Sequence, residues 1–256
     1  MPEPVIPDIS PQQLRAFARD GYIVVSQVVS SGLIDAARRA IADRAAHDPP
    51  RAGHRGPLFD FVVGELPRDL AGPLFDCATL ALAESLIAPA SFERPDHVQV
   101  SLNIPPWPHE PGGPHIDGLT PPEPDGRPGT FTMLAGIFLT DQSRENAGNL
   151  WVWPGSHLAA ADYLRHQGPD ALLSCVPYPP VELGQPRQVT ARPGDVLFAH
   201  YLLGHNIGGN ISEVRREVLY FRLRRTDHRA RWRQVVQEPL LEFEPVRAAL
   251  DGQSRP

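Results

Sequence analysis

The chain has 256 residues and a net charge of -6 at pH 7, and all 24 of its basic side chains are arginine. This length fits one well-buried domain, and no stripe of basic residues with interleaved aromatic residues indicates a nucleic-acid partner. The longest nearly apolar run, residues 131–139, is too short to span a bilayer, and the first ten residues lack the pattern of a signal peptide. Cys77 and Cys175 fit two reduced thiols better than a disulfide framework, so we expect a cytoplasmic protein without a membrane segment.

The first segment of the chain carries a helix signal. Ser10, Pro11 and Gln13 form a capping box with proline at the first helical position, which predicts a short helix that ends at Asp20. Residues 21–29 are rich in β-branched side chains and predict a strand.

The segments that follow alternate between helical and irregular patterns. Apolar residues recur at helical spacing over residues 33–41. The region 49–73 is rich in Pro and Gly and predicts an irregular connection, and a further helix is expected over residues 74–87.

The central part of the chain predicts a sheet. In residues 97–104, HVQVSLNI, apolar and polar side chains alternate with a period of two. Further strand candidates, separated by turns with Gly, Pro or Asn, are residues 131–139, 149–153, 187–190, 195–200 and 215–223. Many short strands indicate a sandwich or barrel. Helices are expected at residues 156–167, between strands, and at 229–237.

His115 and Asp117 are a candidate pair of metal ligands. Residues two apart on a strand point to the same side, so both side chains could reach one ion while Ile116 faces away. Two histidines and one carboxylate can occupy one face of a ferrous ion and leave its other positions open. The pair alone is weak evidence, because such a spacing arises easily by chance in a chain with ten histidines.

A third ligand and a carboxylate-binding residue lie in one later segment. His205 is a candidate third ligand, and His200, five residues earlier, competes with it. Arg216 shares a strand face with Val218 and Tyr220 and offers a planar fork for a carboxylate, although Arg215 has an equal claim on charge alone. The residues by themselves leave both choices open.

Four blocks of the chain, in this order, resemble the phytanoyl-CoA dioxygenase family of iron(II) and 2-oxoglutarate oxygenases. The resemblance covers most of the chain. The blocks are LRAFARDGYIVV (14–25), PHIDG (114–118), ENAGNLWVWPGSH (145–157), and GDVLFAHYLLGHNIGGN (194–210) running into RREVLYFRL (215–223).

The resemblance implies a mainly β fold with flanking helices around a double-stranded β-helix of the jelly-roll or cupin type. One oxygenase domain would then span residues 1–256. Its expected parts are a mostly helical N-terminal elaboration (1–90), a β core with the inserted helix 156–167 (92–225), and a C-terminal extension (226–256).

The resemblance also selects among the candidate site residues. It implies iron(II) bound by His115, Asp117 and His205, with dioxygen and 2-oxoglutarate as co-reactants. It implies that Arg216, rather than Arg215, binds 2-oxoglutarate. Asn103 matches a position that contacts the cosubstrate in relatives, and Gln99 would line the same cavity. His200 then takes a neighbouring or substrate-contacting role.

The implied reaction is hydroxylation of a substrate carbon with release of succinate and carbon dioxide. Asp117 disfavours chlorination, because halogenating relatives carry a small residue there. Desaturation, ring formation and epimerisation stay open. Two departures concern the cosubstrate pocket: Gly136 and Ile137 stand where several relatives carry an aromatic residue, and Ile207 replaces a hydroxyl residue.

The substrate is expected to be a small molecule, and a secondary metabolite is favoured over a CoA thioester because no clustered basic patch is evident. Aromatic wall candidates are Trp107, His109, Trp151 and Trp153, although tryptophans on strands lie more often in a core. His157 is a similar candidate.

Two Pro- and Gly-rich loops, 105–114 and 121–129, flank the metal pair and could close over a substrate. Two rival readings remain: a cupin-like metal isomerase or dioxygenase that does not use 2-oxoglutarate, and a non-catalytic ligand-binding module.

Overall fold

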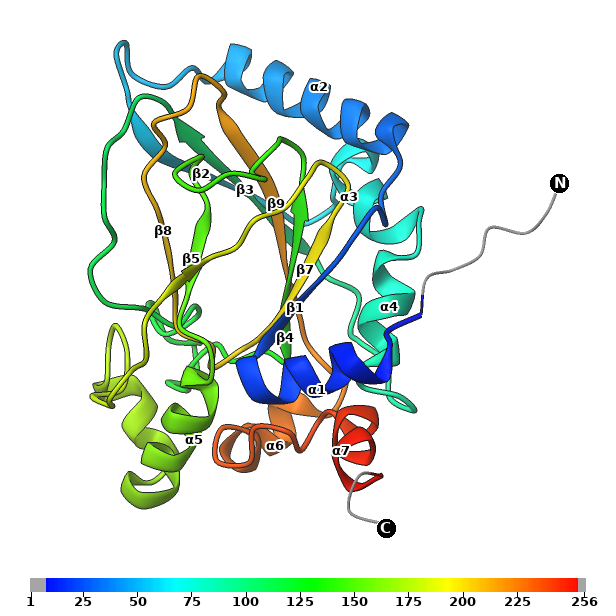
Figure 1. Cartoon of the computed structure of the whole chain (residues 1–256), viewed down its shortest axis with the longest axis vertical. Helices are drawn as coiled ribbons and strands as arrows, with labels where there is room; N and C mark the ends of the chain where they lie inside the picture. Colours follow the sequence, from blue (N-terminus) through cyan, green and yellow to red (C-terminus); the bar gives the residue numbers. More distant parts are fainter. Residues whose placement is uncertain (1–7, 253–256) are drawn as a thin grey trace, which may run out of the picture.

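The structure is a computed structural model that describes residues 8–252 as two antiparallel sheets flanked by helices (Figure 1). The strands are β1 (Tyr22–Val25), β2 (Gly56–Val63), β3 (His97–Ile104), β4 (Met133–Phe138), β5 (Leu150–Val152), β6 (Arg187–Gln188), β7 (Val196–His200), β8 (His205–Ile207) and β9 (Arg216–Leu223). The helices are α1 (Pro11–Asp20), α2 (Ser31–His47), α3 (Arg68–Phe75), α4 (Thr79–Ser85), α5 (Ser156–Gln167), the 3-10 helix η1 (Pro169–Ser174), α6 (His228–Val235) and α7 (Glu244–Asp251). None of these helices has the length and apolar character needed to cross a membrane.

The larger sheet has six strands in the order β1-β7-β4-β9-β3-β2, and the smaller sheet has three in the order β6-β5-β8. Helices α1, α2, α3, α4 and α7 pack on one face of the larger sheet. The other face meets the smaller sheet, with α5 and α6 alongside (Figure 1). The expected mainly antiparallel core with flanking helices is therefore confirmed.

Strand β9 shows how the larger sheet separates the two layers. Leu219 and Phe221 are buried under the helices, whereas Val218 and Tyr220 are buried between the two sheets. Because side chains alternate along a strand, the even-numbered positions, beginning with Arg216, face the space between the sheets.

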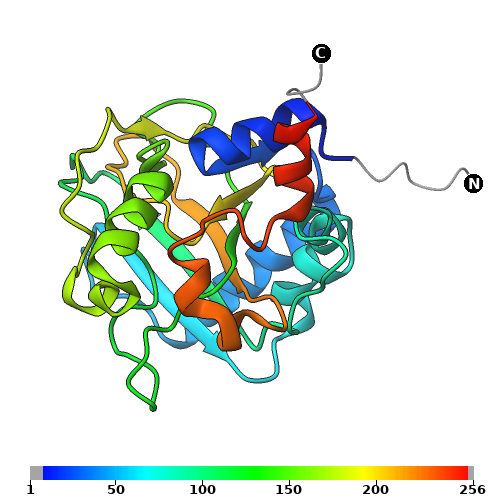
Figure 2. The same cartoon turned by 90° about the horizontal axis from the view of Figure 1, so that it is seen from below.

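The N-terminal helix is confirmed as expected. Gln13 N donates to Ser10 Oγ at 3.2 Å, and Ser10 N donates to Gln13 Oε1 at 3.0 Å, so both halves of the capping box are present. The helix ends at Asp20 because Gly21 adopts a left-handed φ of 82°. Helix α1 packs beside α7, which brings the two ends of the described chain together (Figure 2).

The irregular connection expected over residues 49–73 is wrong, because strand β2 and the start of α3 lie there. Strand β2 is at the edge of the larger sheet and pairs only with β3. An edge strand tolerates Pro57, which cannot donate a backbone hydrogen bond. The proline and glycine content of this region therefore led to a wrong prediction for strand β2.

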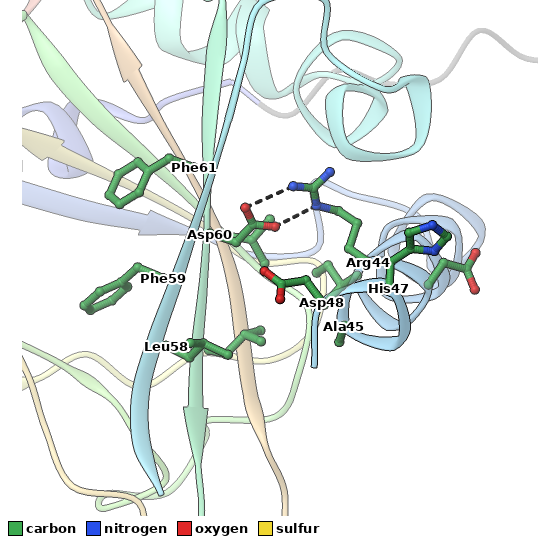
Figure 3. Close-up of a pocket in the computed structure, with 12 residues that line it drawn as sticks. Arg44, Ala45, His47, Asp48, Leu58, Phe59, Asp60 and Phe61 are labelled. Carbon is green, nitrogen blue, oxygen red and sulfur yellow. Dashed lines mark hydrogen bonds and ion pairs between the residues drawn. The ribbon is translucent and has the colours of Figure 1, made fainter. Parts of the chain in front are cut away.

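Side chains of β2 alternate between the two faces of the sheet. Phe59 and Phe61 point to one side, whereas Leu58 and Asp60 point toward α2 (Figure 3). On that side Arg44 of α2 pairs with Asp60, with Nε 2.6 Å from Oδ2. The two phenylalanines consequently lie on the side of the smaller sheet.

Other boundaries differ by a few residues. The helix at 156–167 has the expected bounds, and the predicted strands after residue 130 are present in shortened form. The helix expected at 74–87 is instead the end of α3 and the shorter α4, and α7 was not anticipated.

A buried polar cluster ties the C-terminal segment to the larger sheet. Glu242 Oε2 accepts a hydrogen bond from Thr132 Oγ1 at 2.8 Å and lies 2.8 Å from His228 Nδ1. His228 Nε2 lies 2.9 Å from Thr130 Oγ1. His228 and Glu242 are both fully buried, so each depends on the others for its hydrogen bonds.

The substitution Glu242→Ala is expected to lower the free energy of unfolding by about 3 kcal/mol, because it leaves buried partners unpaired. Urea denaturation measures this. Arg233→Ala is the control: it removes an exposed ion pair with Asp170 and should change the stability by less than about 0.5 kcal/mol. Equal effects in the two variants would contradict the structural role of the cluster.

His157 and His200 form a second buried polar pair, with ring centroids 5.1 Å apart. His200 Nε2 donates to Pro239 O at 2.7 Å, and Leu202 N donates to His200 Nδ1 at 3.0 Å. Burial, with a smaller effect of His157, lowers the pKa of His200 to about 3. Burial also lowers the pKa of His157 to about 4. Both rings are therefore neutral at physiological pH.

The stability should fall in mild acid because of these histidines. An unfolded histidine binds a proton near pH 6.5, whereas folded His200 binds one only near pH 3, so stability decreases as the pH falls from 6.5 toward 3. From pH 6.5 to 5 the expected loss is about 2 kcal/mol for each buried histidine. Urea denaturation across this range should show about half the pH dependence in His200→Gln, and an unaltered slope in that variant would contradict the assignment. The control His166→Gln changes an exposed histidine and should leave the slope unchanged.

Candidate metal centre

His115, Asp117 and His205 come together at the edge of the smaller sheet. His115 and His205 form an antiparallel bridge, in which His115 N donates to His205 O at 3.0 Å and His205 N donates to His115 O at 3.3 Å. Asp117 Oδ1 lies 3.5 Å from His115 Nε2 and 3.7 Å from His205 Nε2. Among residues 8–252 this is the one group of three or more His, Cys, Asp or Glu side chains whose potential ligand atoms all lie within 4.8 Å of one another. The arrangement is compact enough for a single ion.

The backbone around Asp117 depends on a glycine. Gly118 has a φ of 77°, and a Cβ at this position would lie 2.2 Å from Gly129 O. Gly129 N donates to Gly118 O at 2.8 Å, which closes the base of the loop 121–129. The tight turn after Asp117 therefore requires glycine, and it replaces the strand on which Asp117 was expected.

Hydrogen bonds orient the two histidines differently. His205 Nδ1 lies 3.0 Å from Leu203 O, so the Nδ1 proton is donated to that carbonyl and Nε2 keeps a lone pair that faces Asp117. His115 is the more exposed of the two, with 39% of its side chain accessible against 12% for His205. His115 therefore lies on the more open side of the site, and His205 on the more enclosed side.

The charges at the site favour an ionised carboxylate. Burial opposes ionisation, but hydrogen bonds to His115 and His205 and the charges of His205 and Arg222 hold the pKa of Asp117 well below its usual value. Burial, followed by the neighbouring His205, lowers the pKa of His115. Burial opposes protonation of His205 too, but a proton on Nε2 would be donated to Asp117, and this raises the pKa of His205 overall.

Arg216 is buried beside this group without an acidic partner. Its side chain is only 1% exposed. Nη1 donates to Ser101 Oγ at 2.6 Å, Nη2 to Tyr220 Oη at 2.6 Å and Nε to Gln142 Oε1 at 3.4 Å. No carboxylate within residues 8–252 forms an ion pair with it, whereas the neighbouring Arg215 pairs with Glu217. A buried guanidinium with neutral partners alone is costly, so the site favours an anion.

A cavity of about 280 Å³ between the two sheets joins Arg216 to the metal-ligand group. The residues that line it are Phe59, Phe61, Gln99, Ser101, His115, Asp117, Leu134, Leu150, His205, Asn206, Ile207, Arg216, Tyr220 and Arg222. Exposure rises from Arg216 at 1% to Phe59 and Phe61 at 45% and 53%, so the cavity has a closed end at Arg216 and a mouth at β2.

The two weaker cosubstrate candidates differ in position. Gln99 lines the cavity and accepts a hydrogen bond from Arg222 Nη2 at 2.9 Å. Asn103 is fully buried, donates to Gly208 O at 2.9 Å and is not among the lining residues. The structure therefore brings Gln99 to the site and leaves Asn103 beside it.

The four aromatic wall candidates do not line the cavity. Trp107 and His109 stack on each other at 4.3 Å in the loop before His115. Trp151 packs against the turn at Gly208, and Trp153 is 6% exposed. At these positions the side chains support loops and the core of the smaller sheet.

The structure does not place His200 in the substrate-contacting role that was expected for it. Its ring lies between Phe17, His157 and Phe243 and bonds to Pro239 O. This places His200 under the helices, outside the cavity. His157 is likewise buried, with Nε2 3.2 Å from Ala18 O.

Three groups of the site were missed by the sequence interpretation. Arg222 Nη2 donates to Asp117 Oδ2 at 2.8 Å. The sequence did contain a signal for Arg222, because it is an even-numbered residue of the 215–223 strand and therefore shares a face with Arg216. Phe59 and Phe61 gave no signal, because they lie in the segment taken as irregular.

Gly136 leaves space for a neighbouring aromatic ring. Gly136 faces Tyr220 across the sheet, and a Cβ at Gly136 would lie 2.7 Å from Tyr220 Cε1. The missing side chain on β4 makes room for the Tyr220 ring, whose hydroxyl bonds to Arg216. Ile207, the second departure, lines the cavity as an apolar residue.

Several solved structures resemble this fold. The non-heme α-ketoglutarate-dependent carbocyclase SnoK from nogalamycin biosynthesis is 21% identical, with 84% of this chain and 83% of that chain covered and a TM-score of 0.57. HygX from Streptomyces hygroscopicus, with nickel and 2-oxoglutarate bound, is 20% identical over 86% of this chain and 88% of that chain, with a TM-score of 0.57. The epimerase SnoN, also from nogalamycin biosynthesis, is 23% identical over 82% and 80%, with a TM-score of 0.52. At these identities the likeness shows the fold.

No curated protein sequence matches the chain. The family model described as phytanoyl-CoA dioxygenase (PhyH) matches residues 17–218, which include the metal-ligand group and Arg216. The chain therefore belongs to the phytanoyl-CoA dioxygenase family.

Proposed function

We propose that this protein is an iron(II)- and 2-oxoglutarate-dependent oxygenase that hydroxylates a small molecule and releases succinate and carbon dioxide. His115, Asp117 and His205 are the proposed iron ligands, and Arg216 the proposed partner of the far carboxylate of 2-oxoglutarate. The observation that carries the proposal is a buried arginine without an acidic partner at the closed end of a cavity that also holds the three ligand side chains.

The residues at the site fit both iron(II) and 2-oxoglutarate. Two imidazoles and one carboxylate are a donor set typical of non-heme iron(II) oxygenases. The lowered pKa of Asp117 keeps the carboxylate ionised, and the hydrogen bond to Leu203 O leaves Nε2 of His205 free to bind a metal. Arg216 lacks the counter-charge that a dicarboxylate would bring.

The roles of the chain's own residues follow from their contacts. Arg222 occupies Oδ2 of Asp117 at 2.8 Å, which leaves Oδ1 facing the two histidines. Ser101 and Tyr220 hold the Arg216 guanidinium in one orientation. When bound, iron and 2-oxoglutarate supply the oxidising chemistry with dioxygen, and the protein positions the reactants.

The finer architecture belongs to the same proposal. We infer that the two facing sheets form a double-stranded β-helix, and that residues 1–256 make one oxygenase domain with the divisions expected from the sequence. Strands β1 and β2 join the larger sheet from the N-terminal part. The loops 105–114 and 121–129 stay proposed as a lid.

The reaction outcome is proposed as hydroxylation, although the solved relatives include a carbocyclase and an epimerase. A carboxylate at position 117 would take the coordination position that a halide would need, which disfavours chlorination. The small-molecule substrate is supported by HygX, which was solved with hygromycin B, and by SnoN, solved with nogalamycin RO. Arg216 argues against a cupin-like isomerase, because that chemistry needs no buried cation for a dicarboxylate.

Anaerobic titration of the protein with iron(II) and 2-oxoglutarate should produce the weak visible charge-transfer band of the chelate. His115→Ala should lose the band, because the metal loses a ligand. Arg216→Ala should keep iron binding but weaken 2-oxoglutarate binding at least about tenfold, because a charge-assisted contact is lost. Arg215→Ala is the matched control, since Arg215 pairs with Glu217 outside the cavity.

Circular dichroism of each variant separates misfolding from loss of a ligand. Iron binding without a band in the wild-type protein would favour the isomerase. No iron binding at all would favour the non-catalytic ligand-binding module and overturn the proposal.

Tyr220→Phe tests the support of Arg216 separately. The substitution removes the hydroxyl that accepts from Arg216 Nη2, so the dissociation constant of 2-oxoglutarate should rise about tenfold. The affinity for iron(II) should stay the same, because Tyr220 contacts none of the three ligands. Tyr163→Phe on α5 serves as control. An unchanged affinity for 2-oxoglutarate in Tyr220→Phe would contradict the role of this hydroxyl.

A further inference from the structure

Arg222 lines the cavity and lies next to the metal-ligand group. Its Nη2 makes two hydrogen bonds, to Asp117 Oδ2 at 2.8 Å and to Gln99 Oε1 at 2.9 Å. Within residues 8–252, Nε and Nη1 have no hydrogen-bond acceptor. The side chain is 16% exposed, so three N–H donors of a largely covered guanidinium are available to a bound molecule.

Two aromatic rings lie near this guanidinium. Its Cζ lies 5.8 Å from the centroid of Phe61 and 6.0 Å from that of Phe131. Such rings fix the plane of a guanidinium without using its N–H donors. Phe61, together with Phe59, also forms the mouth of the cavity. Arg222 thus contacts Asp117 of the proposed metal site and lies near Phe61 of the mouth.

The charges in the cavity do not balance without a further anion. Among the lining residues the charged ones are Asp117, Arg216 and Arg222. Iron(II) and the dianion of 2-oxoglutarate would cancel each other, and with Asp117 and Arg216 the site would be neutral. The charge of Arg222 then remains, in a confined space where an unbalanced charge is costly.

Neighbouring arginines do not share this property. Arg224 lies 3.5 Å from Glu93 and 3.6 Å from Glu123, and Arg229 lies 3.8 Å from the same two residues. Their charges are compensated locally. Arg222 pairs only with Asp117. If Asp117 binds a metal ion, the charge of Arg222 has no other carboxylate to balance it, unlike the charges of Arg224 and Arg229.

We propose that Arg222 binds an anionic oxygen group of the substrate, and that an apolar or aromatic part of the same molecule lies against Phe59 and Phe61. The inference rests on the proposed function and names the class of its substrate. An anion at Arg222 would fix the substrate beside the metal ligands, and the phenylalanines would cover its apolar part at the mouth.

The test compares matched probes on the protein loaded with iron(II) and excess 2-oxoglutarate, without oxygen. The probes are 3-phenylpropionate, its uncharged amide 3-phenylpropanamide, and phenyl phosphate, and calorimetry gives their dissociation constants. The carboxylate or the phosphate should bind at least about tenfold more tightly than the amide, because hydrogen bonds to a charged partner are stronger. The preferred anion identifies the group.

Variants assign the preference to Arg222. Arg222→Gln should abolish the preference for the anion, and Arg222→Lys should retain part of it, because lysine keeps the charge without the planar fork. Arg233→Gln, an exposed arginine of α6, should leave it unchanged. Iron binding is titrated for each variant, so that a loss at Asp117 is not mistaken for a loss of the anion site.

Several outcomes would overturn the inference. One is equal affinity of the wild-type protein for the anions and the amide, a comparison that needs no variant. Another is a preference that persists in Arg222→Gln. Loss of the charge-transfer band on adding the anion would mean that it displaces 2-oxoglutarate, and the inference would fail. Absence of the band before any probe is added would instead overturn the proposed function, and this inference with it.

Discussion

The register of strand β9 is the constraint on which the site depends. Its pairing with β3 on one side and β4 on the other places Arg216, Tyr220 and Arg222 on the face toward the smaller sheet. A slip of one residue would turn all three toward the helices. The register is held by the buried odd-numbered residues, Leu219 and Phe221 among them, each of which stabilises the fold by about 1.5–3 kcal/mol. Apolar packing on one face thus maintains charged groups on the other.

The two arginines on this face differ in how far they are enclosed. Arg216 is enclosed with neutral partners, whereas Arg222 shares the carboxylate of Asp117 and lies nearer the mouth. Because these arginines are six residues apart on one strand, their Cα atoms are separated by about 20 Å. Two anion-binding positions on this strand can therefore serve different molecules.

The sequence could predict much of this because the relevant signals are local. The alternation in residues 97–104 and the capping box at Ser10 depend on near neighbours, and both were confirmed. The spacing of His115 and Asp117 was local as well. The family resemblance selected His205 over His200 and Arg216 over Arg215, and the structure brings both selected residues to one cavity with the pair. The bond between the proposed ligand Asp117 and Arg222 spans 105 residues, so no local pattern could reveal it. His200 was ambiguous for a similar reason, because its partner Pro239 lies in the C-terminal segment.

Gly136 on β4 shows how such long-range dependence shapes the site. Gly136 has no side chain, and the ring of its cross-strand neighbour Tyr220 occupies that space. If an aromatic residue stood at position 136, Tyr220 could not keep this position, and Arg216 would lose the hydroxyl that accepts from Nη2. Glycine on one strand and tyrosine on the next therefore act as a pair. A change at either position must therefore be accommodated by the other.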